Sequence, residues 1–187
     1  MPSAYIKGIG YYVPENIVTN QDLERHMETS DAWIQERTGI QQRRYGTRHK
    51  ETTSTLGTEA AKRALAHAGI EASDLDLIIF ATLSPDYYFP GSGVLLQRQL
   101  GINKKEIPCL DIRNQCSGFI YGLSVADAFI RSGSYANILL VGAETHSMGL
   151  DFSTRGRNVT VIFGDGAGAA VISATDEKSE AEHTRWG

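Results

Sequence analysis

Cysteine is scarce in this sequence: Cys109 and Cys116 are the two that occur in 187 residues. Two cysteines build no disulfide framework, and their spacing is not that of a metal-binding pair. We therefore expect free thiols, a reducing compartment and no metal cofactor. No run approaches the roughly 18 consecutive apolar residues of a membrane span, and residues 1–16 lack the pattern of a secretory signal. The sequence predicts a soluble, cytoplasmic protein with no membrane partner.

A surplus of positive charge is also missing. The formal net charge is −4 at pH 7, whereas a nucleic-acid binder needs a basic face that neutralises phosphates. We therefore expect no nucleic-acid partner, although a basic cluster remains at Arg43, Arg44 and Arg48. Hydrophobic residues make up 41% and charged residues 21%, which is ordinary for a globular protein that buries a core in one large domain or two small ones.

Predicted strands and helices alternate along the chain. β-branched and apolar runs predict strands, and apolar residues at helical spacing predict helices. Because the internal strand runs are apolar throughout, we expect an α/β layer in which a mainly parallel sheet is buried on both faces. The predicted strands cover 4–14, 76–82, 108–112 and 136–144, and the predicted helices cover 20–27, 31–38, 53–68, 92–100 and 116–132.

The stretch "DIRNQCSGFIYGL" (111–123) places one cysteine where an apolar helix is predicted to begin. Helix N-termini carry unpaired N–H groups and a partial positive charge, which stabilise a thiolate, the nucleophilic form of cysteine. Ser117 and Gly118 are small and leave the backbone beside Cys116 open, and its own N–H can face an oxyanion. The alternative is a small buried hydrophobe, and spacing alone leaves both interpretations open. Cys109 lies inside an apolar strand and is expected to pack in the core.

The glycine-rich stretch "FGDGAGAAVIS" (163–173) matches neither a dinucleotide-binding nor a phosphate-binding loop. In a strand, Gly164, Gly166 and Gly168 would share one face, where a helix or a neighbouring backbone could approach closely. We interpret the stretch as a strand whose small side chains allow close packing beneath the functional site.

Six segments of the chain together form a recognisable pattern: "TSDAWIQERTGI" (29–40), "FPG" (89–91), "QCSGFIYGLSVADAFIRSG" (115–133), "VGAE" (141–144), "TRG" (154–156) and "FGDGAGAAV" (163–171). Their order and approximate spacing, across almost the whole chain, resemble those of β-ketoacyl-[acyl-carrier-protein] synthase III, the initiating condensing enzyme of fatty-acid synthesis in the thiolase superfamily.

The resemblance implies a thiolase-like α/β fold of two similar halves, each with layered helices around a mixed five-stranded sheet. Residues 1–175 match the first half, and the polar residues 176–187 are expected to be a linker or the truncated start of the second. The thiolate of Cys116 would accept an acyl group from acyl-CoA. The carbanion from decarboxylated malonyl-acyl-carrier protein would then attack the acyl-cysteine. The implied partners are acyl-CoA, acyl carrier protein, and either a second copy or a second thiolase-like half.

Five further residues match functional positions of that family. Trp33 matches the tryptophan that stacks on the adenine of CoA, and Arg37, Arg155 and Thr29 match residues at the same site. Phe89 matches the aromatic residue that lines the acyl pocket of the partner in family dimers. The alternatives are that Trp33 is a half-buried core aromatic and that Arg37 is a solvated surface residue.

The sequence departs from the family pattern in two ways. Arg113, Asn114 and Gln115 precede Cys116, where the family commonly has small residues, so the resemblance does not fix the acyl pocket or the primer. The histidine and asparagine that complete catalysis belong to the second half, and no residue here matches them; His146, at a strand end, is more simply explained as a surface residue. The alternatives to fatty-acid initiation are polyketide-type condensation and a non-catalytic partner subunit. A cysteine hydrolase would need a base that we do not find. In every case an isolated half should expose an apolar face and self-associate.

Overall fold

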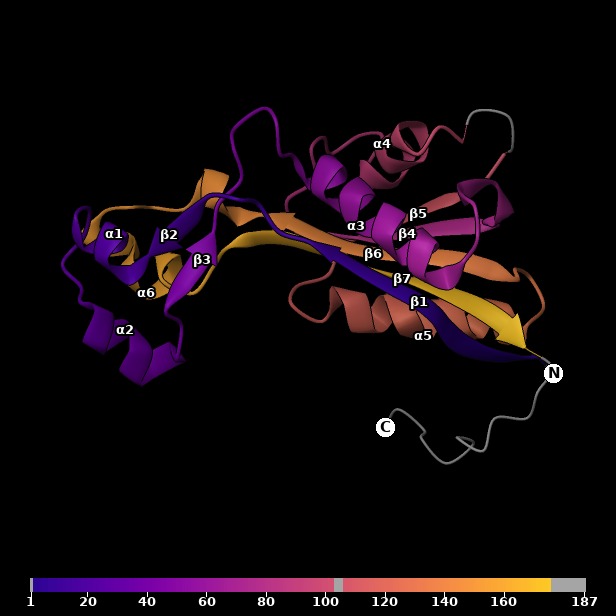
Figure 1. Cartoon of the computed structure of the whole chain (residues 1–187), viewed down its shortest axis with the longest axis horizontal. Coiled ribbons are helices and arrows are strands. Elements are labelled where there is room, and N and C mark those ends of the chain that lie inside the picture. The colour runs from indigo at the N-terminus through magenta and orange to yellow at the C-terminus, as the bar shows by residue number, and fades with distance from the viewer. Residues whose placement is uncertain (1, 103–105, 176–187) are drawn as a thin grey trace.

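The computed structural model describes residues 2–102 and 106–175 (Figure 1). The predicted linker 176–187 lies outside the described residues. The strands are β1 (Ser3–Tyr12), β2 (Ile17–Thr19), β3 (Gln42–Arg44), β4 (Leu77–Ala81), β5 (Cys109–Ile112), β6 (Asn137–Thr145) and β7 (Asp165–Thr175). The helices are α1 (Asn20–Glu24), α2 (Asp31–Thr38), α3 (Thr53–Ala68), α4 (Ser92–Gln99), α5 (Gly118–Arg131) and α6 (Arg157–Thr160), with short 3₁₀ turns at Ala72–Asp74, His146–Gly149 and Thr154–Gly156.

A five-stranded mixed sheet forms the centre, in the order β1-β7-β6-β4-β5. The strands β5, β4 and β6 pair in parallel, whereas β7 pairs antiparallel with both β6 and β1. Four strands therefore run in one direction and β7 alone runs against them. This arrangement confirms the predicted mixed five-stranded sheet with layered helices.

Helices cover both faces of this sheet (Figure 1). One apolar cluster packs α3 and α4 against one face, and a second packs α5 against the other. The prediction of buried apolar strands is confirmed for β4, whose five residues are all buried, and for most of β6. It is wrong for β5, which is an edge strand where Leu110 and Asp111 are exposed, because nothing in a strand's own composition fixes its place in the sheet order.

The helix α3 packs very closely on the strand β1. A Cβ atom added at Gly10 would lie 2.4 Å from the carbonyl oxygen of Ala60, and one at Gly8 would lie 2.5 Å from the backbone nitrogen of Ala68. The predicted close approach of a neighbouring backbone to the glycines at 164, 166 and 168 is present at the first two. An added Cβ would lie 3.3 Å from the carbonyl oxygen of Arg44 at Gly164 and 3.4 Å from that of Tyr12 at Gly166. The prediction is wrong for Gly168. At Gly168 an added Cβ would meet nothing within 4 Å. The alanine face of β7, not its glycine face, lies in the cluster under α3.

The predicted helix ends are mostly confirmed. Thr19 caps α1 through a capping box, and Ser30 caps α2 by accepting a hydrogen bond from the backbone N–H of Trp33. Gly39 and Gly69 follow α2 and α3 with φ of 72° and 66°, left-handed values that suit glycine. Two bounds differ from the prediction by two residues or more, because α1 ends at residue 24 and α5 begins at residue 118; α4 and α5 each end one residue early, at 99 and 131. Within the described residues, no helix is long and apolar enough to cross a membrane.

Strand direction brings several of the sequence motifs to one end of the sheet, where the parallel strands have their carboxyl ends; this end is called the carboxyl edge below. Because β4, β5 and β6 are parallel, their carboxyl ends lie together, and the segments that follow them begin there. At this end, residues 17–44 and 151–162 form a small lobe that contains α1, α2, α6 and the β2–β3 pair (Figure 1). Ligands of open α/β sheets commonly bind at the carboxyl ends of the strands.

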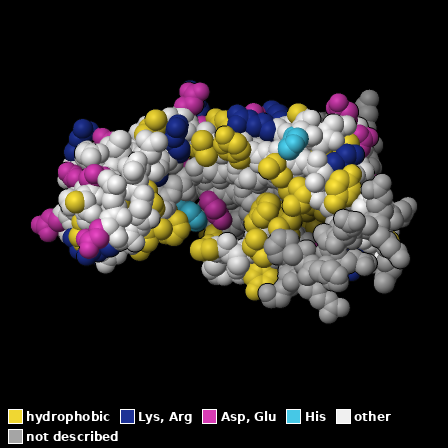
Figure 2. Space-filling view, turned by 60° about the horizontal axis from the view of Figure 1, so that its bottom comes forward, with side chains coloured by type: hydrophobic (Ala, Val, Ile, Leu, Met, Phe, Trp, Pro, Cys, Tyr) yellow, Lys and Arg dark blue, Asp and Glu magenta, His cyan; other side chains and the backbone are white. Residues whose placement is uncertain are grey.

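The α5 side of the molecule is rich in exposed apolar side chains (Figure 2). Ile120 and Tyr121 on α5 are more than half exposed, and Ile9 and Tyr11 on β1 are exposed to a similar degree. Exposed apolar surface of this kind marks an interaction face in soluble proteins. The predicted bare face is therefore present among the described residues.

Candidate active site

Cys116 lies in the turn that joins β5 to α5, at the carboxyl edge of the sheet. The cysteine is exposed, so the interpretation of a buried hydrophobe is wrong for it. The turn is closed by Gly118 N–H, which donates to the carbonyl oxygen of Gln115 at 2.8 Å. Ser117 is the N-cap residue of α5, yet its side chain makes no capping hydrogen bond. The start of α5 therefore keeps N–H groups that are not capped by that side chain, close in sequence to the thiol.

Cys109 has a different environment. It is partly buried against the cluster under α3, and its Sγ lies 3.4 Å from Oε1 of Gln97. Burial, with a smaller contribution from the negative charge of Asp111, raises the pKa of the Cys109 thiol to about 11. Very little thiolate is present at neutral pH, so this cysteine is poorly suited to nucleophilic attack. The packing role predicted for it is confirmed.

The segment 82–91, which joins β4 to α4 and is called the aromatic loop below, lies beside the turn that holds Cys116. The guanidinium carbon of Arg113 lies 4.9 Å from the ring centroid of Tyr88. The next residue, Phe89, is 91% exposed and is joined to Pro90 by a cis peptide bond. The loop therefore presents Phe89 to the outside. The polar residues that precede Cys116 reach this loop through Arg113.

Two carboxylates anchor the ends of the aromatic loop. Glu144, at the end of β6, accepts hydrogen bonds from the backbone N–H of Leu83 at 2.8 Å and of Ser84 at 3.0 Å. Asp111, in β5, accepts one from the backbone N–H of Gly93 at 2.9 Å, in the first turn of α4. Hydrogen bonds from N–H groups to a carboxylate are among the stronger ones in proteins. The two ends of the loop are therefore held in place, while Phe89 between them is exposed.

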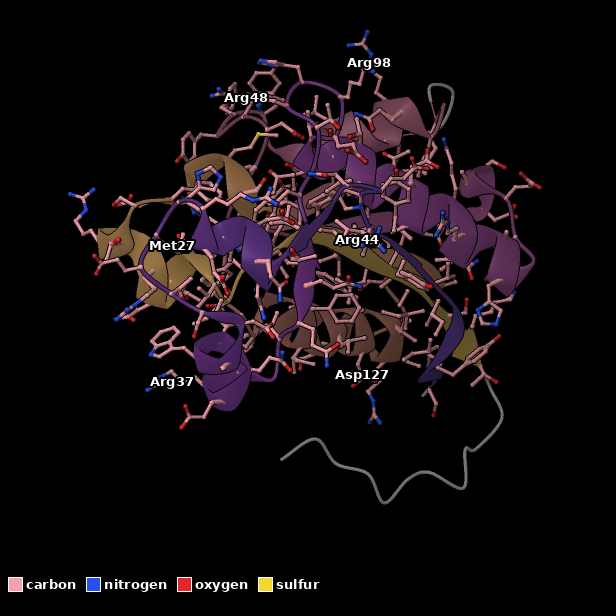
Figure 3. All side chains as sticks on the ribbon, turned by 60° about the vertical axis from the view of Figure 1, so that its left-hand side comes forward. Met27, Arg37, Arg44, Arg48, Arg98 and Asp127 are labelled. Atoms are coloured by element: carbon pink, nitrogen blue, oxygen red, sulfur yellow. The ribbon has the colours of Figure 1, made fainter. Side chains whose placement is uncertain are left out.

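Trp33 and Arg37 lie together on α2, in the lobe. The guanidinium carbon of Arg37 is 4.4 Å from the centroid of the Trp33 ring, and its Nη1 donates to the carbonyl oxygen of Trp33 at 3.3 Å. Arg37 projects from the outer end of the lobe (Figure 3). Trp33 is half-buried and packs on the small apolar cluster that Ile34 and Val161 help to form. The interpretation of Trp33 as a half-buried core aromatic is therefore confirmed, and its stacking on CoA stays a prediction.

The other two residues of the predicted CoA site differ in their surroundings. The Oγ1 atom of Thr29 is buried and has no hydrogen-bond partner among the described residues. Arg155 has an 89% exposed side chain and binds Asp151, with Nε to Oδ2 at 2.8 Å. Hydrogen bonds from Ser153, and then from Arg155, lower the pKa of the Asp151 carboxyl to about 2. Arg155 therefore forms an ion pair with the Asp151 carboxylate.

Sequence reasoning missed one residue of this site, Arg157. Its guanidinium carbon lies 4.5 Å from the Trp33 centroid, and its Nη1 donates to the carbonyl oxygen of Glu28 at 2.8 Å. Arg157 is thus the second arginine over the Trp33 ring, whereas Arg155, which the resemblance places beside the adenine of CoA, binds Asp151 here. The signal available in the sequence was weak, because Arg157 stands only two positions after Arg155 and lies outside the matched "TRG" motif.

His146 lies near a separate cleft at the same edge of the sheet. The cleft is open, has a volume of about 580 Å³, and is lined by residues from 48–52, 84–87 and 145–149. The His146 side chain is 26% exposed, its Nε2 lies 3.8 Å from Oε2 of Glu144, and its ring meets Phe163 edge-on. It is thus more enclosed than the expected surface residue. Neither Cys116 nor Trp33 lines this cleft.

Comparison with known proteins gives a consistent result. A family model described as 3-oxoacyl-[acyl-carrier-protein (ACP)] synthase III matches residues 110–187. The β-ketoacyl-[acyl-carrier-protein] synthase III of Fusobacterium nucleatum is 48% identical over 177 residues, which are 95% of this chain and 52% of that protein. The crystal structure of 3-oxoacyl-[acyl-carrier-protein] synthase III from Aquifex aeolicus matches with a TM-score of 0.88 and 44% identity, covering 95% of this chain and 55% of that one.

A solved structure of a different pathway is also similar. The priming β-ketosynthase of the R1128 polyketide biosynthetic pathway matches with a TM-score of 0.86 and 31% identity, covering 94% of this chain and 51% of that one. The chain spans about half the length of the curated relatives that it matches. Over the half that it spans, the chain is similar in sequence and in structure to β-ketoacyl-[acyl-carrier-protein] synthase III.

Proposed function

We propose that this chain is the nucleophile-bearing part of a β-ketoacyl-[acyl-carrier-protein] synthase III, and that Cys116 is its catalytic residue. The observation that carries the proposal is the exposed cysteine beside the start of α5, at the carboxyl edge of the sheet. In the first step the Cys116 thiolate attacks the thioester carbonyl of acyl-CoA. A new carbon–sulfur bond forms, the bond to the CoA sulfur breaks, and CoA leaves as its thiolate. N–H groups at the start of α5 stabilise the transient oxyanion.

The donor-binding surface in this proposal is the outer lobe. Trp33 offers an aromatic face to the adenine of CoA, Arg155 flanks that adenine, and Arg37 supplies a nearby cation that contacts CoA. Thr29 adds a buried hydroxyl whose oxygen lacks a partner among the described residues, which suits a hydrogen bond to a ligand. The lobe and Cys116 lie at the same edge of the sheet, as a long pantetheine thioester requires.

The second step is the condensation. Malonyl-acyl-carrier protein loses CO₂, and the resulting carbanion attacks the acyl-cysteine carbonyl. The new carbon–carbon bond releases the Cys116 sulfur and starts fatty-acid synthesis. No residue of the chain matches the family histidine and asparagine, so the first step should proceed in this chain while the condensation awaits further residues. In a homodimer of the complete enzyme, Phe89 lines the acyl pocket of the partner.

Acylation can be tested by intact mass after incubation with acetyl-CoA. We expect a mass gain of one acetyl group in the wild-type chain and in Cys109→Ser, and none in Cys116→Ser. The Cys109→Ser variant is the matched control, because it removes the other thiol and leaves the turn before α5 unchanged. An acetyl adduct that forms equally fast in Cys116→Ser would overturn the proposal.

A polyketide-priming activity is the second candidate. It is favoured by Arg113, Asn114 and Gln115 before the cysteine and by the contact of Arg113 with Tyr88. These residues suit a primer other than acetyl. Acylation rates with straight, branched and aromatic acyl-CoA donors distinguish the two candidates, because a fatty-acid initiator prefers short donors. A chain that accepts no donor at all would instead be a non-catalytic partner subunit.

A further inference from the structure

Arg43 is a buried cation that no carboxylate of the described residues contacts. The residue lies in β3 and is only 6% exposed. Its Nη2 donates to the carbonyl oxygen of Val161 at 3.0 Å, and its Nη1 donates to that of Val18 at 3.4 Å. These two neutral acceptors leave the charge of the guanidinium uncompensated, and a buried charge is unfavourable unless it is paired. The remaining donor, Nε, is buried and has no hydrogen-bond partner in the described part of the chain.

A second unpartnered donor belongs to Tyr45. This residue is 8% exposed, and its hydroxyl is buried without a hydrogen-bond partner among the residues described. The Tyr45 N–H donates to the carbonyl oxygen of Asn16, which continues the β2–β3 pairing by one position. Arg43 and Tyr45 are therefore two positions apart in extended chain, and their side chains lie on the same face of it.

Arg43 is also the charged residue with the largest effect on Tyr45. Burial raises the pKa of the Tyr45 phenol, the Arg43 cation opposes that rise, and the negative charge of Asp165 adds a smaller one. The Asp165 carboxylate is itself occupied, because it accepts hydrogen bonds from the backbone N–H groups of Gly46 at 2.7 Å and of Ser147 at 2.9 Å. Two buried donors beside an uncompensated cation call for a negatively charged acceptor.

The two residues lie where the lobe joins the central sheet. Through its hydrogen bonds, Arg43 connects β3 to β2 and to the residue that follows α6. The backbone N–H after Tyr45 is bound by Asp165, the first residue of β7. An added Cβ at Gly164 would lie 3.1 Å from the Cβ of Arg43, so the start of β7 packs against β3 here. A ligand of Arg43 and Tyr45 would therefore strengthen the connection between the lobe and the sheet.

We propose that Arg43 Nε and the Tyr45 hydroxyl bind a small anion, and that the anion is chloride. A single-atom anion suits donors that have no contact with solvent, because a larger oxyanion such as phosphate needs more space and more donors than these two. The anion neutralises the guanidinium and supplies the acceptor that both donors lack. It stabilises the folded chain and takes no part in acyl transfer.

The first test compares the melting temperature of the full chain in sodium chloride and in sodium gluconate at equal ionic strength. For a dissociation constant of about 10 mM, chloride at about 100 mM should raise the melting temperature by about 3–5 °C. Tyr45→Phe should lose most of this rise, because it removes one donor and keeps the ring that meets Phe152 edge-on. The matched control is Tyr121→Phe, which removes an exposed hydroxyl on α5 and should keep the full rise.

The second test identifies the ligand by anomalous diffraction from crystals of the chain grown in sodium bromide. We expect a bromide peak in contact with both Arg43 Nε and the Tyr45 hydroxyl. Density at that place without an anomalous signal would overturn the proposal, because the ligand would then be a buried water. Bromide peaks confined to the surface, an adventitious ion only, would overturn it as well, and so would a chloride effect of equal size in Tyr45→Phe.

Discussion

Replacing Gly10 with alanine should destabilise the chain, because β1 and α3 are in direct backbone contact there. The added Cβ would lie 2.4 Å from both the carbonyl oxygen of Ala60 and the backbone nitrogen of Ala64. These are backbone atoms of a helix, so they cannot rotate away, and the helix and the strand must separate by several tenths of an ångström. Overpacking of this kind costs about 1–3 kcal/mol, and the rigid contact places Gly10→Ala in the upper part of that range.

The matched control is Gly168→Ala, in a strand of the same sheet. An added Cβ there meets nothing within 4 Å, so no contact opposes it. Alanine also loses less backbone entropy than glycine on folding, so this variant should be unchanged or up to about 1 kcal/mol more stable.

Urea denaturation followed by circular dichroism measures both variants. With a slope of about 2 kcal/mol per molar urea, Gly10→Ala should lower the midpoint by about 1–2 M relative to Gly168→Ala. Equal midpoints for the two variants would refute the close packing of α3 on β1.

Three further predictions follow from the charges, the thiols and the exposed face. The pKa of Asp151 is lowered from 3.8 to about 2, so its ionised form stabilises the fold above pH 4 and this contribution is lost as pH falls towards 2. Asp151→Asn should therefore lower the melting temperature at pH 7 and not at pH 2. An equal loss at both pH values would contradict the lowered pKa. The pKa of Cys109 is raised from 9.0 to about 11. In Cys116→Ser the remaining thiol, Cys109, should therefore react with iodoacetamide at pH 8 about 100-fold more slowly than an unperturbed thiol. Reaction at the rate of an unperturbed thiol would contradict the burial of Cys109. Ile120→Lys should reduce self-association in analytical ultracentrifugation, because it places a charge on the exposed face of α5; an unchanged oligomer size would show that α5 is not the contact.

Local signals in the sequence predicted most of the fold. The continuous apolar runs of β4 and β6 report burial on both faces, and Ser30 with Gly39 marks the ends of α2 through side-chain capping and a left-handed residue. Strand order and direction depend on contacts far apart in the sequence. For that reason the edge position of β5 and the reversed direction of β7 did not follow from the residues of either strand.

In the candidate site, too, local features could be predicted from the sequence and contacts between distant segments could not. The position of Cys116 before α5 could be predicted, because a helix start and its flanking small residues are local features. The pairing of Trp33 with Arg157 could not, since the two residues are separated by more than a hundred positions and meet only when the lobe has folded. The Asp151 carboxylate that holds Arg155 is likewise visible only in the structure.

The central claim is that Cys116 is the residue that takes the acyl group. Peptide mapping after incubation with labelled acetyl-CoA tests it most directly, because trypsin cuts after Arg113 and places the two cysteines in different peptides. The account predicts label on the peptide that begins at residue 114, released by hydroxylamine as a thioester is. Label on the Cys109 peptide, or none on either peptide, would contradict it.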